Sequence, residues 1–283
     1  MTVIQLLYSI IIGIIQGVSE WLPISSKTQI LVSSQYLFGL TYPQAYTLGL
    51  FMEIGTLAAA IIYFRKDLLK LVQVLAGSKD QMKRKLFIYL LIVTAITAVI
   101  AAPLYLIADS IKGIAVGVPM LIIGLVLIGD AVLIRYSRKR LAKGVTARKL
   151  ENLTIKDYII VGITQGISAL PGVSRSGITT SAMLLLGIEP DEAFRLSFTA
   201  GIFAALGAFG LTLVASESNV SASVAAIGGV TGLVAAIITS FIISIFLIDF
   251  LIKFAGKQKI TYLTAALGAI AIASGVIYLA LGL

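Results

Sequence analysis

The residues best suited to chemistry lie in one short polar stretch, Leu170–Gly177, inside an otherwise apolar region. The stretch places Arg175 between Ser174 and Ser176, three residues after Gly172. A guanidinium group in a membrane-embedded segment needs a partner or a water-filled cavity, so it indicates a functional site. Glycine and serine backbone at a helix start binds anions, and arginine adds a planar fork of donors suited to phosphate. The stretch therefore predicts a phosphate site.

The composition sets the class of protein around this site. Of 283 residues, 59% are hydrophobic and 12% are charged, and the mean hydropathy is +1.04. A soluble domain carries about 25% charged residues. Several apolar runs approach or exceed the roughly 20 residues that cross a bilayer. We therefore expect an all-α polytopic membrane protein.

The sequence has no cysteine and no histidine. Disulfides, thiolate chemistry, zinc sites with cysteine or histidine ligands, and imidazole bases are therefore excluded. Acid–base chemistry has to come from carboxylates, lysines, hydroxyls or metal-bound water.

The net charge of +9 is concentrated in three basic loops, Arg65–Lys85, Arg135–Lys156 and Lys253–Lys259. The positive-inside rule accounts for this pattern and predicts that the three loops are cytoplasmic. The short loops Asp109–Lys112 and Ser216–Ser221 lack such clusters and are expected outside. Nucleic acid is not expected as a partner, because it requires an organised basic surface.

Two segments half a chain apart repeat one pattern. Gly13–Ser19 matches Gly162–Ser168 almost residue for residue. A proline follows each segment, and then comes a serine-rich step with one cation, Ser25-Ser26-Lys27 or Ser174-Arg175-Ser176. Self-similarity at this spacing indicates an internal duplication.

Each copy breaks after too few residues to span comfortably, and a short run follows, Lys27–Gly39 or Gly177–Gly187. Such interrupted segments at matching positions predict re-entrant helix hairpins that meet near the membrane midplane. An odd number of membrane crossings in each half is also obtained with three full crossings in place of a hairpin plus one crossing. The hairpins are preferred because non-helical backbone at membrane depth has to be buried or line a cavity.

About three full crossings then follow in each half, and this odd number inverts the second copy. The predicted crossings are Tyr46–Phe64, Leu86–Ile107, Ile114–Ile134, Leu196–Ala215, Val224–Leu251 and Ile260–Leu281. We predict a single membrane domain with an inverted-topology repeat, in which repeat one covers about 1–134, a basic linker 135–156, and repeat two about 157–283.

The first copy supplies a carboxylate. Gln16 and Glu20 are four residues apart, so they share one helix face. Ser25 and Ser26 are expected to cap the next helix, and Lys27 follows in its first turn.

In the second copy, Ser174 and Ser176 are expected to cap a helix that begins near Gly177. Arg175 would then face the cavity, and Thr179 lies in the first turn. The two inverted tips would bring Glu20, Ser26 and Lys27 to face Ser174, Arg175 and Thr179. Helix dipoles and the arginine favour a phosphate, and the carboxylate suits a divalent cation or a general base.

Glu53 is a second candidate carboxylate in an apolar segment. Two interpretations stay open for it. It completes a metal site with Glu20, or it is an interfacial residue satisfied by water.

These residues carry a resemblance to the undecaprenyl-diphosphate phosphatases of the bacitracin-resistance type. The family's (E/Q)-x-x-x-E motif is represented by Gln16–Glu20, and its Leu-Pro-x-Ser-Ser step by Leu22–Ser26. Its second signature, P-G-x-S-R-S-G-x-T, is met in full by Pro171–Thr179. The similarity extends over essentially the whole chain.

The resemblance implies an integral enzyme of the plasma membrane that removes the terminal phosphate of a long-chain polyprenyl diphosphate and so recycles a lipid carrier. It also implies an inverted repeat with re-entrant helices, and a divalent cation, magnesium or calcium. The family's functional positions fall on Glu20, Ser26, Ser174, Arg175 and Thr179. We expect further phosphate contacts from Gln16, Ser25, Lys27, Gly172 and Ser176.

This sequence departs from the family at three positions. Gln29 occupies the position of a usual histidine, Gly49 that of an acidic residue, and Glu53 that of a glutamine. Glu20, or a water on a metal held by Glu20 and Glu53, is therefore expected to deprotonate the nucleophile. Whether the nucleophile is Ser26 or water stays open.

A function from another class is a flippase for polyprenyl phosphate, because inverted repeats with broken helices are also a transporter architecture. Phosphate release separates the two, since a carrier releases none. The sequence leaves the oligomeric state open, with a dimer as one option.

Overall fold

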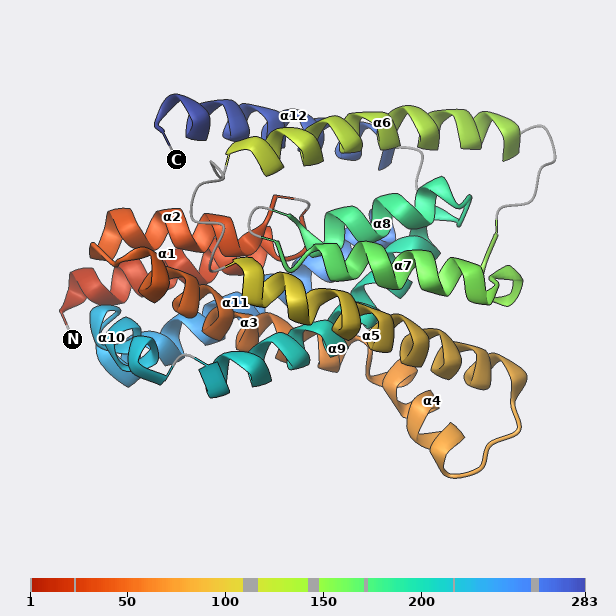
Figure 1. Cartoon of the computed structure of the whole chain (residues 1–283), viewed down its shortest axis with the longest axis horizontal. Helices are drawn as coiled ribbons and strands as arrows, with labels where there is room; N and C mark the ends of the chain where they lie inside the picture. The colour runs from red at the N-terminus through yellow and green to blue at the C-terminus, as the bar shows by residue number, and fades with distance from the viewer. Residues whose placement is uncertain are drawn as a thin grey trace.

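The computed structural model describes residues 2–22, 24–108, 117–141, 148–170, 173–215, 217–255 and 260–282, and over these ranges the chain is helical (Figure 1). The predicted all-α class is confirmed. The helices are α1 (Val3–Ser19), α2 (Ser26–Phe38), α3 (Tyr42–Tyr63), α4 (Arg65–Leu75), α5 (Gln81–Ala108), α6 (Gly117–Leu141), a 3₁₀ turn (Leu150–Asn152), α7 (Ile155–Ile167), α8 (Arg175–Leu185), α9 (Pro190–Ala215), α10 (Glu217–Ala226), α11 (Gly229–Ala255) and α12 (Ile260–Ala280).

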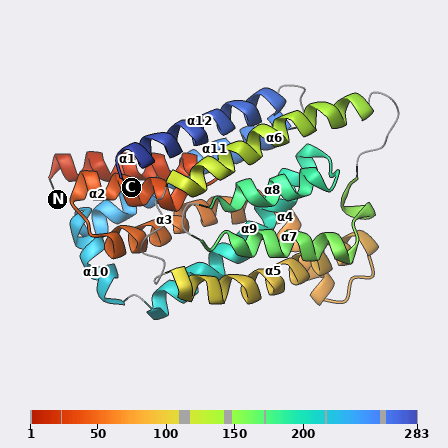
Figure 2. The same cartoon turned by 45° about the horizontal axis from the view of Figure 1, so that its top comes forward.

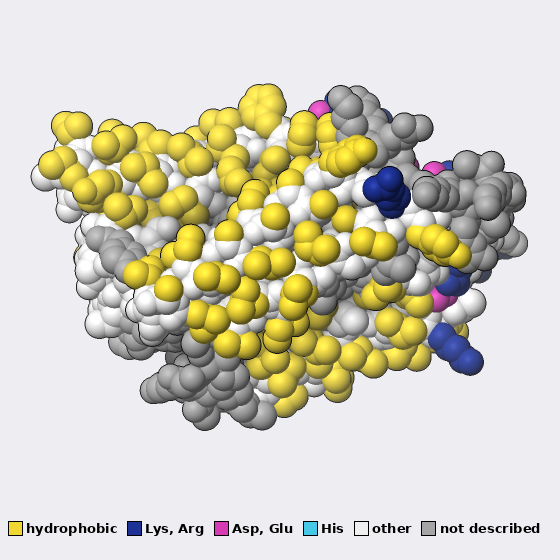
Figure 3. Space-filling view, turned by 90° about the horizontal axis from the view of Figure 1, so that it is seen from above, with side chains coloured by type: hydrophobic (Ala, Val, Ile, Leu, Met, Phe, Trp, Pro, Cys, Tyr) yellow, Lys and Arg dark blue, Asp and Glu magenta, His cyan; other side chains and the backbone are white. Residues whose placement is uncertain are grey.

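Four of the described helices, α5, α9, α11 and α12, are long and apolar enough to cross a membrane. Helices α3 and α4 form a pair bent by 72°, which raises the count to five if the pair is one span. Figure 3 shows a largely apolar surface with lysine, arginine and acidic side chains gathered toward one end. The chain is therefore a multi-pass membrane protein, whereas six full crossings stay a prediction.

One predicted crossing, Val224–Leu251, has the wrong boundary. The chain turns between α10 and α11, where Gly228 and Gly229 have φ of 93° and 70°. Glycine adopts this left-handed region without a steric penalty, so the pair ends one helix and starts the next. The crossing helix is Gly229–Ala255.

The two interrupted segments fold as predicted into pairs of short helices. Helix α1 ends at Ser19 and α2 begins at Ser26, while α7 ends at Ile167 and α8 begins at Arg175. Both second helices begin one or two residues earlier than expected. Each loop between paired helices, together with the first residues of the helix that follows, is called a tip: the first tip is residues 20–27 and the second tip is residues 168–176.

Glycines let the helix before each tip approach a long helix closely. On α1, a Cβ added at Gly13 would lie 2.5 Å from the carbonyl oxygen of Ala236 on α11. On α7, a Cβ added at Gly162 would lie 2.8 Å from Cβ of Ile96 on α5. Small residues drive helix association in membranes because they allow backbones to approach. The repeated glycines therefore fix the helices that carry the tips.

Helices α6 and α12 lie side by side along one edge of the molecule (Figures 1 and 2). Glycines on both helices form their contact, since a Cβ at Gly124 would lie 2.8 Å from the carbonyl oxygen of Gly268. Helix α6 also contacts α8. The pair thus covers one side of the second tip's helix.

The buried apolar side chains form clusters on either side of the tips. One joins α5, α7, α8 and α9, and another joins α1, α2, α3 and α11. A third cluster holds Trp21 of the first tip, which packs edge-to-face on Phe198 of α9 with ring centroids 5.0 Å apart. This contact anchors the first tip to the helix behind the second.

An ion pair fixes the start of α7. Asp157 Oδ2 accepts hydrogen bonds from Nη2 of Arg148 and from the amide of Thr154, both at 2.6 Å. Burial raises the pKa of Asp157, but the Arg148 guanidinium and the Thr154 donors outweigh burial and hold the pKa below its usual value. The charged form is therefore the stabilising one.

Replacing Asp157 with Asn tests this pair. Because the folded pKa lies below the unfolded pKa of about 3.9, the ion pair stabilises above that pH and its contribution is lost as the pH falls through the folded pKa. We expect D157N to unfold at a lower temperature than the parent at pH 6, and the difference to shrink below about pH 4. Thermal unfolding in detergent from pH 3 to 7 measures it, and a pH-independent difference contradicts the assignment.

Candidate active site

The two tips are in direct contact. Nη2 of Arg175 donates to Oε1 of Glu20 in a short ion pair. The Ser176 hydroxyl donates to the backbone oxygen of Glu20 at 3.2 Å, and the Ser174 hydroxyl donates to that of Leu22 at 3.4 Å. The predicted meeting of the tips is confirmed.

Glu20 is the acceptor at the centre of the contact. Its Oε2 accepts from the Ser26 hydroxyl at 2.6 Å and from Nε2 of Gln16 at 3.0 Å, while Arg175 occupies Oε1. The predicted shared face of Gln16 and Glu20 is confirmed. Both carboxylate oxygens are engaged, and the residue is only 7% exposed. Multiple donors are what a buried carboxylate needs to stay charged.

Arg175 is held from two sides. Its Nη1 donates to the backbone oxygen of Gly201 on α9 at 3.0 Å, while Nη2 reaches Glu20. A Cβ added at Gly201 would lie 3.4 Å from Nε, so a side chain there would press on the guanidinium. A guanidinium has five N–H donors, and the described residues accept from two of them. Within the described residues, the other three have no acceptor.

A second ion pair stands beside the first. Nζ of Lys27 lies 3.5 Å from Oε1 of Glu53, which is 3% exposed. Within the described residues, Oε2 of Glu53 has no hydrogen-bond partner. Burial excludes an interfacial residue satisfied by bulk water, and the carboxylate pairs with Lys27 instead. A metal site shared with Glu20 stays a prediction.

These groups enclose one small pocket of about 30 Å³. It is lined by Glu20, Ser25, Ser26, Lys27, Glu53, Ser168, Val173, Ser174 and Arg175. Seven of these were predicted from the sequence. Glu20, Ser26, Ser174 and Arg175 were predicted as catalytic, Ser25 and Lys27 as phosphate-binding, and Glu53, with Glu20, as a metal ligand. The pocket combines two cations with two carboxylates and several hydroxyls.

Ser25 does not cap α2 as predicted. It stands at the N-cap position with φ of 54°, and its hydroxyl shares a hydrogen bond with that of Thr28 at 3.1 Å. A positive φ at a residue with a side chain is strained, and such residues persist where the surrounding structure holds them. The strain lies in the wall of the small pocket.

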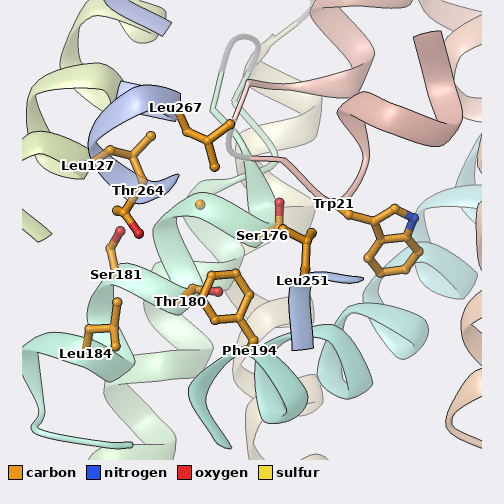
Figure 4. A pocket seen from close by; sticks show the side chains of 11 residues that line it. Trp21, Leu127, Ser176, Thr180, Ser181, Leu184, Phe194, Leu251, Thr264 and Leu267 are labelled. Carbon is orange, nitrogen blue, oxygen red and sulfur yellow. The ribbon is translucent and has the colours of Figure 1, made fainter. Parts of the chain in front are cut away.

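Ser174 caps α8 as predicted, because its Oγ accepts from the amide of Gly177 at 3.3 Å. The helix begins at Arg175 rather than near Gly177. Ser176 is not a cap, since its hydroxyl donates to carbonyl oxygens of the first tip. It lines a different, mostly apolar pocket of about 20 Å³ together with Thr180 and Trp21 (Figure 4).

Thr179 lies behind the small pocket rather than in its wall. Its hydroxyl bonds the backbone oxygen of Arg175 at 2.6 Å and the hydroxyl of Ser197 at 2.5 Å. Thr179 therefore positions the helical turn that carries Arg175. This differs from the direct phosphate contact that we predicted. Gly172 lies outside the described residues.

The carboxylate oxygens at the site limit how the predicted divalent cation can be bound. Among the described residues, no group of three acidic side chains gathers to bind a metal. Glu20 has both oxygens engaged, so the predicted Glu20–Glu53 pair offers one free oxygen, Oε2 of Glu53. Magnesium is usually bound by one or two carboxylates together with substrate phosphates and waters, so a single free oxygen fits a cation that shares the substrate.

Gln29 does not line the small pocket. It donates to the backbone oxygen of Ile24 at 3.2 Å and accepts from the hydroxyl of Tyr278 at 3.3 Å. The residue thus ties the first tip to α12.

Two residues of the pocket wall, Ser168 and Val173, and three residues around the pocket were not predicted as site residues. Gly201 and Ser197, both on α9, hold Arg175 and Thr179 from behind, and no sequence signal distinguishes them. Gln165 lines an adjacent cavity. Its match to Gln16 in the repeat was a signal that could have found it.

The fold and site define a multi-pass helical membrane protein with an arginine–carboxylate site buried where two broken helices converge. The chain belongs to the bacitracin resistance protein BacA family, which matches residues 9–273. It is 46% identical to an undecaprenyl-diphosphatase of Sulfurisphaera tokodaii over 275 residues, which covers 96% of this chain and 98% of the relative. Another undecaprenyl-diphosphatase, from Saccharolobus solfataricus, is 46% identical over 96% of both chains. One from Pyrobaculum aerophilum is 39% identical over 94% of this chain and 96% of its own.

Coupling across the tips gives a stability test. Arg175→Met leaves the Glu20 carboxylate buried without its cation. Removing one partner of a buried ion pair lowers the free energy of unfolding by about 3–5 kcal/mol. We expect the double variant R175M/E20Q to be more stable than R175M alone, because it removes both charges. Thermal unfolding in detergent compares the four proteins. Strictly additive losses in the double variant would show that the two side chains are not coupled.

Proposed function

We propose that this protein is a membrane phosphatase that hydrolyses a polyprenyl diphosphate, of the undecaprenyl type, to the polyprenyl phosphate and inorganic phosphate. The observation that carries the proposal is the small pocket, in which Arg175 and Lys27 face Ser26 and Glu20. The names of the relatives and the family membership support the same reaction. The lipid partner is a long-chain polyprenyl diphosphate held within the bilayer.

Arg175 is the residue that binds the terminal phosphate. Its position is set before substrate arrives, by Glu20 and by the backbone of Gly201. Donors fixed in advance stabilise the charge that spreads over the phosphoryl oxygens in the transition state. The Ser174 hydroxyl, in the same wall, adds a further donor.

The geometry favours Ser26 over water as the nucleophile. The Ser26 hydroxyl already donates to Glu20 at 2.6 Å, which is the arrangement of a nucleophile and its base. As Oγ bonds to the terminal phosphorus, its proton passes to Glu20. The bond from that phosphorus to the bridging oxygen breaks, and the polyprenyl phosphate leaves with the electron pair. Water then hydrolyses the phosphoserine and restores the hydroxyl.

Removal of Arg175 tests the assignment. We expect R175A to lose turnover about a thousandfold, and R175K to lose much of it, because an ammonium group lacks the planar fork of donors. Lys253→Ala, at an exposed cation paired with Asp249 on α11, is the matched control and should keep parental activity. Phosphate release from a long-chain polyprenyl diphosphate in lipid is the measurement. Retained turnover in R175A sinks the assignment, and a parent that binds the lipid but releases no phosphate favours the carrier function.

A divalent cation, magnesium or calcium, is part of this proposal. The residue that would hold it is Glu53, through its free oxygen, together with the substrate's phosphates. When bound, the cation neutralises phosphate charge and polarises the phosphoryl group.

Glu53→Gln keeps the size of the side chain but removes the charged ligand. We therefore expect E53Q to need a higher magnesium concentration for half-maximal phosphate release. Asp249→Asn, at an acidic residue near the end of α11 that pairs with Lys253, serves as the control. The measurement is a magnesium titration of phosphate release by the parent, E53Q and D249N. An unchanged magnesium concentration at half-maximal release in E53Q removes Glu53 from the cation site.

The inverted repeat is the architecture that we propose for this site. It is supported by matched packing, because α1 packs on α11 and α7 packs on α5, each through the glycines of the repeated segment. In this arrangement the tips are re-entrant hairpins, and six full crossings place all basic loops on the cytoplasmic side of the plasma membrane. Oligomeric state stays a prediction.

A further inference from the structure

A second cavity of about 310 Å³ lies beside the small pocket. Its wall comes from α5, α7 and α9, which lie side by side in Figures 1 and 2. Lys27 and Arg175 line both spaces. The two cations therefore stand at the border between the small pocket and this larger cavity.

The wall opposite the cations is polar. Gln165, 1% exposed, donates through Nε2 to the hydroxyl of Thr97 at 3.2 Å, and that hydroxyl donates to the backbone oxygen of Gly162. Oε1 of Gln165 and the hydroxyl of Thr94 are buried and have no hydrogen-bond partner in the described part of the chain. Leaving buried polar atoms unpaired is unfavourable, so these two atoms point to a polar ligand.

Apart from Ser168 and the ring of Phe203, the rest of the cavity wall consists mostly of small apolar residues. They come from one face of α5 and one face of α9, and comprise Ala98, Ala101, Ala102, Ala204 and Gly207. Such a surface suits the hydrocarbon next to a phosphate and offers it no hydrogen bonds. The cavity thus has a cationic border, a polar wall and an apolar wall.

The duplication explains why the space is open. In the first copy, Gln16 is followed four residues later by Glu20, whose carboxylate it binds. In the second copy, Gln165 is followed four residues later by Ala169, which lines the cavity. Gln165 therefore keeps the position of Gln16 but has no acidic side chain four residues later to bind.

We propose that this cavity binds the lipid-linked phosphate of the substrate and of the released polyprenyl phosphate, with Gln165 and Thr94 as its specificity-determining residues. The inference rests on the proposed phosphatase function. The terminal phosphate occupies the small pocket, the lipid-linked phosphate lies across Lys27, and the first isoprene units lie on the alanine wall. When the terminal amide group of Gln165 is flipped by 180°, the Thr97 hydroxyl donates to the amide oxygen in place of the Gly162 backbone oxygen, and the amide NH₂ faces the phosphate.

Two inhibitors separate the two spaces. Inorganic phosphate reports on the small pocket, and a polyprenyl monophosphate reports on the cavity. For Gln165→Leu we expect the inhibition constant of the lipid monophosphate and the KM for the diphosphate to rise about tenfold, with kcat much less affected. The inhibition constant of inorganic phosphate should stay within about twofold of the parent.

Thr94→Val is the second variant, and it removes a hydroxyl that no described residue binds. The substitution therefore breaks no hydrogen bond within the described part of the chain, and we expect a rise of about threefold in the same two constants. Thr164→Val is the matched control, because that hydroxyl donates only to backbone oxygens of its own helix. It should leave both inhibition constants unchanged.

Unchanged lipid monophosphate inhibition in both Q165L and T94V overturns the proposal. So does an equal weakening of lipid monophosphate and inorganic phosphate, which would place both ligands in one pocket. Parent turnover tests the phosphatase separately. If the parent releases no phosphate, equilibrium binding of the lipid monophosphate to the parent, Q165L and T94V still decides whether the cavity is its site.

Discussion

The ion pair between Glu20 and Arg175 is the interaction on which the site depends. Each charge comes from a different tip, and each is costly inside a membrane protein without the other. The backbone of the first tip also depends on this contact, because the carbonyl oxygens at the end of the preceding helix have no donors from within that helix. The Ser176 hydroxyl supplies a donor to the backbone oxygen of Glu20, and the Ser174 hydroxyl adds one to that of Leu22, which also accepts from the amide of Ile24. Non-helical backbone is therefore satisfied by the other half of the chain, as membrane burial requires.

The approach of the two tips depends in turn on close packing between the helices that carry them and two long helices. The glycines of the repeated segment bring α1 onto α11 and α7 onto α5, where any larger residue would collide. Trp21 then packs on Phe198 of α9, the helix whose Gly201 carbonyl also receives Arg175. One helix thus supports both tips, and the arginine is oriented by packing as well as by charge.

The two copies differ where the chemistry requires it. The first retains a carboxylate at position 20, bound by a glutamine, a serine and the arginine. The second has Ala169 at the matching position, and Gln165 beside a cavity, where its Oε1 has no partner among the described residues. In the proposed function, the first segment therefore holds the reactive groups and the second leaves room for a ligand. Lys27, paired with Glu53, lies between the two spaces.

Local pattern in the sequence determined the membrane class, the duplication, the broken helices, and the candidacy of Glu20, Ser26 and Arg175. These follow from hydropathy, from helical spacing and from the high cost of charge in an apolar segment, all of which act over a few residues. The tertiary structure alone decided which charges pair: Arg175 with Glu20, and Lys27 with Glu53. It also turned Ser176 and Thr179 toward backbone oxygens and gave Ser25 its positive φ. Pairing, side-chain direction and empty space depend on helices far apart in the chain, which no local pattern records.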